Sequence, residues 1–201
     1  MAISKETVFS EYEVRKLVAK VGDSDTFVIK CIGSLEEESE VVTISKKCRG
    51  VVTKKRTRGT GSGTLKLSAH MPWLAYVKLM GMDADGLADG VYAYGRPSKH
   101  PEFCLTADVY DEDDNNKLKA WPKCVMSAGP AIKTENGAEE VAEVEMEIGF
   151  MPDEAGFGHY ECDPQTATGI KKDTWLNEFT SAAVTTELAD DAEPVVTEDG
   201  E

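Results

Sequence analysis

The amino-acid sequence predicts a single, mainly β domain with one clear short helix. At 201 residues the chain is long enough to bury one good core. Short runs that alternate apolar and polar residues recur along it, separated by clusters of Gly, Asn and Asp. We expect one domain over residues 1–180 and an acidic, disordered tail over residues 181–201, which holds little to bury.

The first quarter of the chain predicts three strands separated by polar turns. Within residues 1–25, Val14, Leu17 and Val18 fit either a strand or a short helix before the GDSD turn, and we favour a strand. We expect a second strand over Thr26–Ile32 and a third over Glu40–Lys47, because these stretches are rich in β-branched residues. The acidic run Ser34–Glu40 between the last two is expected to be a loop. In the third strand, Val42 and Ile44 are expected to face the core.

A basic segment follows, over Cys48–Arg58. Its charged side chains fall on both faces of an extended strand: Lys55 on one, and Lys54, Arg56 and Arg58 on the other. Burying either face would leave charges without water. We therefore predict a long hairpin arm that projects from the body.

The stretch from residue 58 to residue 81 then predicts a turn, a strand and a helix. The glycines of RGTGSG are expected to form the turn, and Thr64–His70 alternates as a strand that has one apolar face. Pro72 suits a helix start, and Gly81 suits its end. Packing of Trp73 and Leu74 is expected to hold this helix.

The second half predicts strands over Gly90–Gly95, Pro101–Tyr110, Lys117–Met126 and Glu140–Phe150, a short strand within residues 158–163, and a helix over residues 173–179. Pro122 indicates an edge position or a bulge in its strand, and Ala142 is expected to face the core. Asp173 is expected to cap the helix, and Trp175, Leu176 and Phe179 are expected to pack down. In the strand ending at Phe150, the side chains of Glu143, Glu145 and Glu147 are expected to line one solvent-facing side, because covering three carboxylates with apolar groups is costly.

Charge is distributed unevenly along the chain. The net formal charge is −15, which disfavours gripping the phosphates of a nucleic acid. Nine Lys or Arg and no acid lie between residues 41 and 82, whereas residues 83–184 hold 21 acids and 8 bases. Because unlike patches on one molecule make a heterologous contact that propagates, this pattern indicates self-assembly.

Enzymatic motifs are not apparent. The five cysteines are scattered without a C-x-x-C pair, and we expect reduced thiols. His70, His100 and His159 are far apart, although a β-sandwich can bring distant histidines to one metal. Two alternatives therefore stay open: a metal-dependent hydrolase built on these histidines, and a carbohydrate-binding module that uses Tyr92, Tyr94 and Trp121 as an aromatic platform.

The succession of parts over residues 12–162 resembles the major tail (tail tube) proteins of long-tailed bacteriophages. The resemblance rests on two early strands, a projecting polar hairpin, the unit GTGSGTLKLSAHM running into a helix that ends LMG, a loop to GVYAYG, and the later strands PEFCLTADVYDEDDNNKLKAWPKCVM and EVEMEIGF. No single motif is specific; the order of the parts carries the likeness.

The resemblance implies a β-sandwich or barrel-like tail tube fold with a flanking helix, and a structural role without enzymatic activity or cofactor. Such subunits form hexameric rings that stack into a tube with an acidic lumen, through which DNA passes without specific binding into the host. By analogy, Glu143, Glu145 and Glu147 would face the lumen, and Lys54, Lys55, Arg56 and Arg58 would belong to the stacking arm.

The resemblance also implies partners and a location. The partners would be copies of this chain, a tape-measure protein, tail assembly chaperones and a tail terminator. The protein would be made in the bacterial cytoplasm and reside in the virion tail. We expect no secretory leader and no membrane contact, because no apolar run approaches the length of a membrane span.

Overall fold

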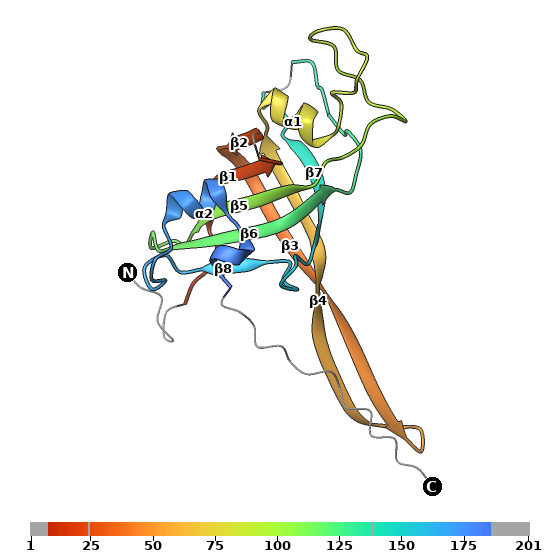
Figure 1. Ribbon diagram of the computed structural model, residues 1–201, viewed down its shortest axis with the longest axis vertical. Coiled ribbons are helices and arrows are strands. Elements are labelled where there is room, and N and C mark those ends of the chain that lie inside the picture. Colours follow the sequence, from red (N-terminus) through yellow and green to blue (C-terminus); the bar gives the residue numbers. More distant parts are fainter. Residues whose placement is uncertain (1–7, 24, 138, 186–201) are drawn as a thin grey trace.

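The computed structural model describes residues 8–23, 25–137 and 139–185 (Figure 1). In this part of the chain, eight strands form one antiparallel sheet with the order β2-β1-β5-β6-β7-β4-β3, and β8 pairs with β6. The mainly β class is thus confirmed. None of the helices in the described ranges is long and apolar enough to cross a membrane. The predicted tail over residues 181–201 lies largely outside the described residues; Ser181–Ala183 form a 3-10 turn.

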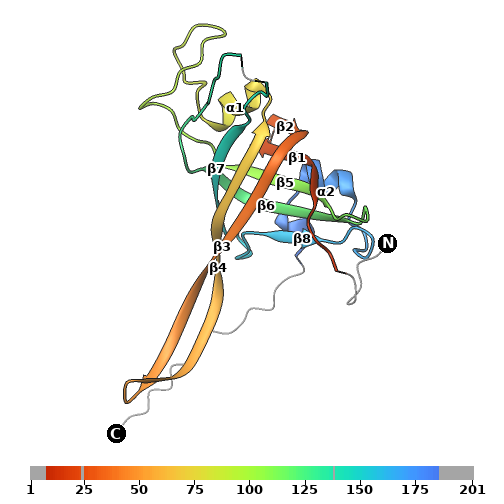
Figure 2. The same ribbon diagram turned by 180° about the vertical axis from the view of Figure 1, so that it is seen from behind.

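The strands run as follows: β1 Glu13–Val21, β2 Asp25–Ile29, β3 Cys31–Cys48, β4 Val51–His70, β5 Phe103–Tyr110, β6 Asn116–Met126, β7 Val144–Met151 and β8 Tyr160–Cys162. The helices are α1, Trp73–Leu79, and α2, Lys172–Glu178. Figure 2 shows the same arrangement from behind.

The sheet curls on itself to enclose its main core. β3, at one edge, also contacts β1 near the other edge, and the inward side chains of both halves pack together. Leu65 and Leu67 of β4 meet Leu105 of β5 and Trp121 of β6 in this core. The alternation of apolar residues in β4, β5 and β7 is therefore realised as predicted.

A second, smaller core lies on the outer face of β1, β5 and β6. Trp175 and Leu176 of α2, with Phe179 directly after it, cover Val18 and Leu118 there. The predicted packing of this helix is confirmed. The expected capping by Asp173 is not, because Lys171 occupies the N-cap and makes no side-chain capping bond.

The helix α1 differs from the expectation. Trp73 and Leu74 are more than half exposed, and the buried face consists of Ala75, Tyr76, Val77 and Leu79. The helix is anchored by Tyr76 and Leu79, which join the main core. The helix ends at Leu79, and Gly81 follows the C-cap Met80 with a positive φ of 59° that suits glycine.

The glycine run and the acidic run, predicted as a turn and a loop, instead lie inside strands. Gly59, Gly61 and Gly63 belong to β4, with a bulge opposite Ser39 and Val41 of β3. Gly61 has a φ of 81°, and a Cβ there would come within 2.9 Å of Pro152. Glycine is required here by close approach of the 152–158 segment, rather than by a turn.

Two further strand predictions are corrected. Gly90–Gly95 forms no strand and belongs to a loop that runs from α1 to β5. β7 begins only at Val144, so Ala142, predicted to face the core, is exposed. Pro122 was expected at an edge or a bulge; it sits at a register shift between β5 and β6, where the partner of β6 changes from β8 to β7.

Candidate assembly surfaces

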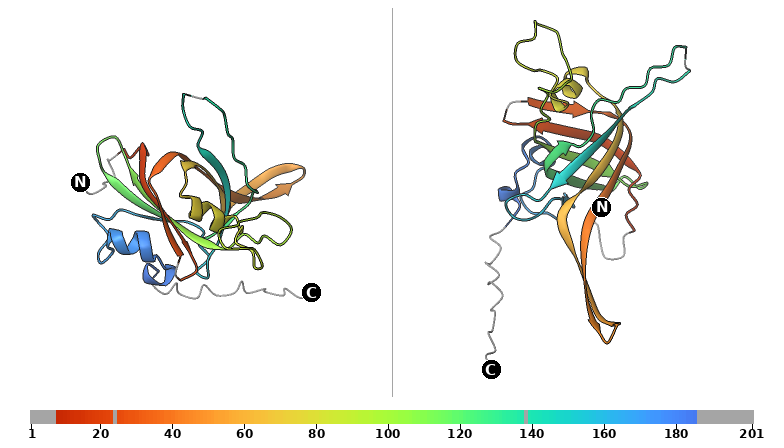
Figure 3. Two further views of the ribbon diagram at one scale, coloured as in Figure 1. Left: turned by 90° about the horizontal axis from the view of Figure 1, so that it is seen from above. Right: turned by 90° about the vertical axis from the view of Figure 1, so that its right-hand side faces the viewer.

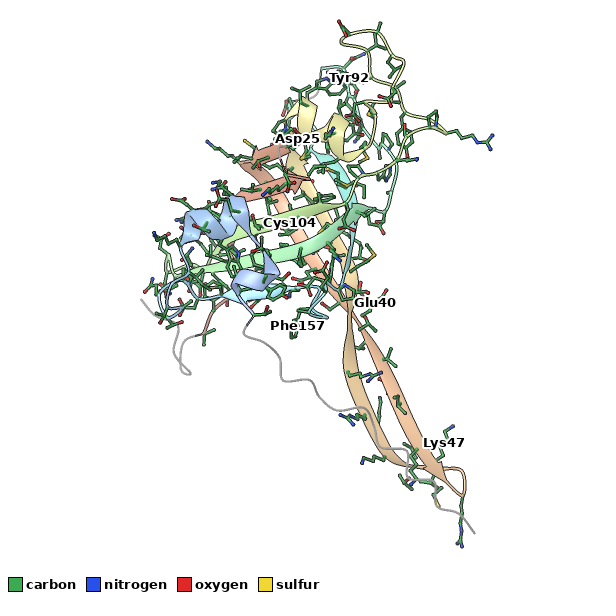
Figure 4. The ribbon with its side chains drawn as sticks, in the orientation of Figure 1. Asp25, Glu40, Lys47, Tyr92, Cys104 and Phe157 are labelled. Carbon is green, nitrogen blue, oxygen red and sulfur yellow. The ribbon has the colours of Figure 1, made fainter. Side chains whose placement is uncertain are left out.

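The outer part of the β3–β4 hairpin projects from the body as a two-stranded arm (Figure 1). We define the arm as residues 41–59, which pair from Val41 opposite Gly59 to Cys48 opposite Val51. The turn at its tip places Arg49 and Gly50 at positive φ. Figure 4 labels Glu40 at its base and Lys47 near its tip. At about 3.4 Å per residue the arm is about 25 Å long.

No part of the arm is buried. Every residue from Glu38 to Thr60 is exposed, and β4 pairs with β7 only from Gly63 onward. The prediction that Val42 and Ile44 face a core is therefore wrong: Ile44 is 59% exposed. A two-stranded ribbon without a packed face is marginal on its own in water.

The two faces of the arm differ in composition. Directly opposed residues share a face, so Val42 with Arg58 and Ile44 with Arg56 form one mixed face of apolar and cationic side chains. Lys46 and Lys54 extend this face toward the tip. The other face holds a hydrogen-bonded pair, Thr43 and Thr57 (2.9 Å between hydroxyl oxygens), and Ser45 opposite Lys55.

The arm carries seven basic side chains and no acidic one: Lys46, Lys47, Arg49, Lys54, Lys55, Arg56 and Arg58. Within the described residues none of them forms an ion pair within 4.0 Å. In the part of the chain that the structure describes, the arm is thus a cationic ribbon that is exposed to solvent and has no paired counter-charge.

A charge cluster links β3, just before the arm begins, to the body of the protein. Lys119 of β6 is buried, and its Nζ lies 2.7 Å from Glu11, 3.4 Å from Glu37 and 3.5 Å from Glu161. Glu37 precedes the exposed part of β3 by one residue. Burial lowers the pKa of Lys119, but hydrogen bonding and attraction to Glu11 and the other carboxylates outweigh it, so the pKa is raised. The side chain stays charged.

His159 completes this cluster. Its ring stacks on Trp121 at 5.4 Å, and its Nδ1 lies 3.0 Å from Glu37. Burial lowers the pKa of His159 by more than the neighbouring carboxylates raise it, so the net shift is downward and favours the neutral ring at neutral pH. The cluster therefore ties β3, β6 and β8 together with two cations and three carboxylates, counting Lys117.

The three glutamates predicted on one face of β7 have different surroundings. Glu145 and Glu147 are exposed on β7, opposite Ser68 and Lys66 of β4. Glu143 precedes the strand, is half-buried and accepts a hydrogen bond from the Ser68 hydroxyl (2.6 Å). Beyond Lys66 the same row reaches Glu36 of β3. The outer face of this half-sheet is therefore largely, but not purely, acidic.

The other candidate residues are not brought together. His70 ends β4, His100 is hydrogen-bonded to the Met126 carbonyl, and His159 lies in the cluster above. No group of three possible metal-binding side chains occurs among the described residues. The aromatic platform is incorrect as predicted, because Trp121 is fully buried while Tyr94 is exposed.

All five cysteines are free thiols. Cys31 and Cys48 are exposed at the two ends of β3, whereas Cys124 and Cys162 are buried. Burial also raises the pKa of Cys104 to about 12, which leaves this thiol protonated and unreactive at neutral pH.

Comparison with known proteins gives structural similarity only. No family model matches the chain, and no curated protein matches it. A chain from the tube-terminating cap of the anti-feeding prophage is 10% identical, with a TM-score of 0.38, over 81% of this chain and 99% of that one. A chain from the six-fold symmetrised baseplate of the same particle is also 10% identical, with a TM-score of 0.38, over 71% and 92%. At this level neither structure identifies a function.

Proposed function

We propose that this chain is a structural subunit of a phage-tail-like particle and assembles with copies of itself into stacked rings that form a tube. One observation carries the proposal: an exposed two-stranded arm with seven basic and no acidic residues projects from a chain whose net charge is −15. Because the charges of the arm have no ion-pair partner among residues 8–23, 25–137 and 139–185, we infer that an acidic surface on another copy is their simplest partner.

The two ends of the molecule's long axis differ, and this supports a contact that propagates. The arm lies at one end of the long axis, and α1 with the loops around it lies at the other (Figure 3). Unlike surfaces at opposite ends give a head-to-tail contact, which extends into a ring or a stack rather than closing as a dimer.

In this proposal the arm residues Lys54, Lys55, Arg56 and Arg58 join neighbouring copies. The acidic row of Glu143, Glu145 and Glu147 faces the lumen, where like charge lets DNA pass without binding. The rings are hexameric, and the partners in the particle are a tape-measure protein, assembly chaperones and a terminator. These finer assignments extend the resemblance noted in the sequence.

Negative-stain electron microscopy of the purified chain, over a range of concentration and salt, tests the proposal. We expect rings or hollow tubes at low ionic strength and fewer of them as salt screens the arm. The variant Arg56→Glu/Arg58→Glu should remain a folded monomer and lose the tubes. Uniform small particles at every condition would contradict self-assembly.

A control with the same change in net charge separates the arm from general electrostatics. Lys30 and Lys171 are exposed on the body, and Lys30→Glu/Lys171→Glu alters charge equally. This variant should assemble nearly as the unmodified chain does. Equal loss of assembly in both variants would show that net charge, and not the arm, controls it.

A further inference from the structure

An open groove of about 1120 Å³ lies at the pole opposite the arm. It is formed between the ends of β4 and β7 and the segment that connects β6 to β7, of which residue 138 is outside the described ranges. In the right-hand view of Figure 3 this segment extends from the upper end of the molecule, while the arm points to the lower end.

The groove combines exposed apolar side chains with carboxylates. Ile132 is 57% exposed and Val141 is 83% exposed. Glu135, which pairs with Lys133 of the groove lining (2.8 Å), and Glu140 lie on the same segment. Glu143 and Glu145, assigned to the lumen in the proposed function, line the side formed by the sheet, so in that arrangement the groove borders the lumen wall. Apolar groups that remain this exposed beside a row of acids are typical of a surface that binds a partner carrying apolar and cationic groups.

One face of the arm has that composition. Val42 and Ile44 of β3 stand beside Arg58 and Arg56 of β4, as the cross-strand register shows. The opposite face carries Thr43, Thr57 and Lys55 along the middle of the arm, and its apolar residues, Val41 and Val52, lie at the base and near the tip. Successive pairs of an apolar and a cationic side chain along the middle of the arm therefore occur on one face. The arm therefore has a preferred side for docking.

The geometry points to the arm of one copy lying in this groove of the next copy, with Val42 and Ile44 against Ile132 and Val141, and Arg56 and Arg58 near Glu135 and Glu140. The inference rests on the proposed function of the arm and adds its receiving surface. An arm cannot reach its own groove, because β4 runs from the arm to His70 in the groove wall, roughly 65 Å at 3.4 Å per residue.

This contact also gives the assembly a direction. The groove and the arm lie at opposite ends of β4. When the arm of one copy binds the groove of a second copy, the first copy therefore keeps a free groove and the second keeps a free arm. Stacking of rings then proceeds along one axis, with the same arm-to-groove interface repeated between successive rings.

A charge swap tests the pairing. Arg56→Glu/Arg58→Glu and Glu135→Lys/Glu140→Lys should each raise the concentration needed for assembly at least tenfold, measured by sedimentation and electron microscopy. All four changes in one chain should return that concentration to within about threefold of the unmodified value. Assembly of the variant that carries all four substitutions would also show that the substituted protein still folds.

Two controls make the test specific to the groove. Glu112→Lys/Asp113→Lys changes two exposed acids at the β5–β6 turn by the same charge and should not restore assembly when combined with the arm reversal. Lys55→Glu alters the other face of the arm and should raise the required concentration much less than Arg56→Glu does.

The outcomes separate the two proposals. Loss of assembly with the arm reversal, but none with the groove reversal, would overturn the groove as the receiving surface and leave the arm's role standing. Failure of the swap to restore assembly, or equal rescue by the control acids, would also overturn it. If the arm reversal has no effect, the proposed function of the arm is itself wrong.

Discussion

β3 and β4 each have a body half and an arm half, and the two halves are stabilised differently. In the body half of β4, Leu65, Leu67 and Ala69 are buried between the two walls of the curled sheet. In the arm half every residue is exposed, and within the described residues the two strands pair only with each other. A continuous pair of strands thus passes from a packed core into solvent.

This difference indicates that the arm has a role other than stabilising the monomer. Backbone pairing without a buried face gives little net stability, so the arm contributes little to the fold of the monomer. Apolar residues such as Val42 and Val51 nevertheless remain exposed along it. We propose that these residues, which lie beside cations without an ion pair in the described part of the chain, become buried against another copy on assembly.

Truncating matched apolar residues in the two halves should give the largest contrast. Leu65→Ala should lower the free energy of unfolding by roughly 3–5 kcal/mol, because it leaves a cavity in the core. Ile44→Ala should change it by less than about 0.5 kcal/mol, because the side chain is exposed. Urea denaturation of the monomers measures both. Similar losses would mean that the arm packs on the body in solution.

Disrupting the charge cluster next to the arm should give the second-largest effect on the free energy of unfolding. Lys119→Ala leaves Glu37 and its neighbours without their buried cation, and we expect a loss of about 2–3 kcal/mol. The value is below that of a fully enclosed pair, because Glu11 and Glu161 remain about 40% exposed and can regain water. Lys117→Ala, nearer to solvent, is the control and should cost less. Equal losses in thermal or urea unfolding would argue against a buried anchor.

A smaller, pH-dependent effect is expected at Asp153. Burial raises its pKa, but hydrogen bonds from the Tyr160 hydroxyl (2.6 Å) and from the backbone N–H groups of Ala155 and Phe157 lower it more. The pKa therefore falls below its ordinary value of 3.8, and the stabilisation is present above that pH and lost as pH drops further. Asp153→Asn should cost about 1–2 kcal/mol at pH 7.

The pH profile of that variant provides the check. Its deficit in unfolding free energy should shrink as pH falls below 3.8, since the native carboxylate then loses its charge. Asp163→Asn, in the more exposed turn that follows β8, serves for comparison. A deficit at Asp153 that stays constant down to pH 2 would contradict the assignment.

The smallest effect is expected inside the arm. Thr57→Ala removes the cross-strand hydroxyl bond to Thr43 and should weaken the hairpin by a few tenths of a kcal/mol. Global unfolding should be unchanged, whereas amide exchange of arm residues should speed up by about twofold. Faster exchange in the body strands as well would show that arm and body open together.

Regular alternation made much of the body predictable. β5, β7 and the body half of β4 were predicted because apolar and polar residues alternate in their sequences, and β6 was predicted as the strand that returns after the turn at residues 111–116. In β5 and β6 both faces are buried, because α2 covers the outer one. The arm was predicted because basic residues occupy both faces of one segment, as at Lys55 and Arg56, and such a segment cannot be buried.

The errors have specific physical causes. The acidic run before the arm was expected to be a loop, but it is part of β3. There the half-buried carboxylate of Glu37 pairs with Lys119, a residue that is distant in sequence. Gly61 suggested a turn, but it permits a bulge and a close contact with Pro152. Trp73 suggested core packing by its type, whereas the position of Tyr76 on α1 decided the buried face.

The receiving groove was not visible in the sequence, because its two walls come from β4 and from a segment more than 60 residues later. The charge imbalance between the halves of the chain indicated only that a counter-surface exists. The register of the arm, which assigns Val42 and Ile44 to the same face as Arg56 and Arg58, required the structure.

Hydrogen–deuterium exchange of the arm, before and after assembly, tests the central claim most directly. In the monomer, amides of residues 41–59 should exchange orders of magnitude faster than those of β5 and β6, since the arm lacks a packed face. In assembled material the arm should become protected to nearly the level of the body. An arm that still exchanges rapidly within assemblies would contradict its role as the contact between copies.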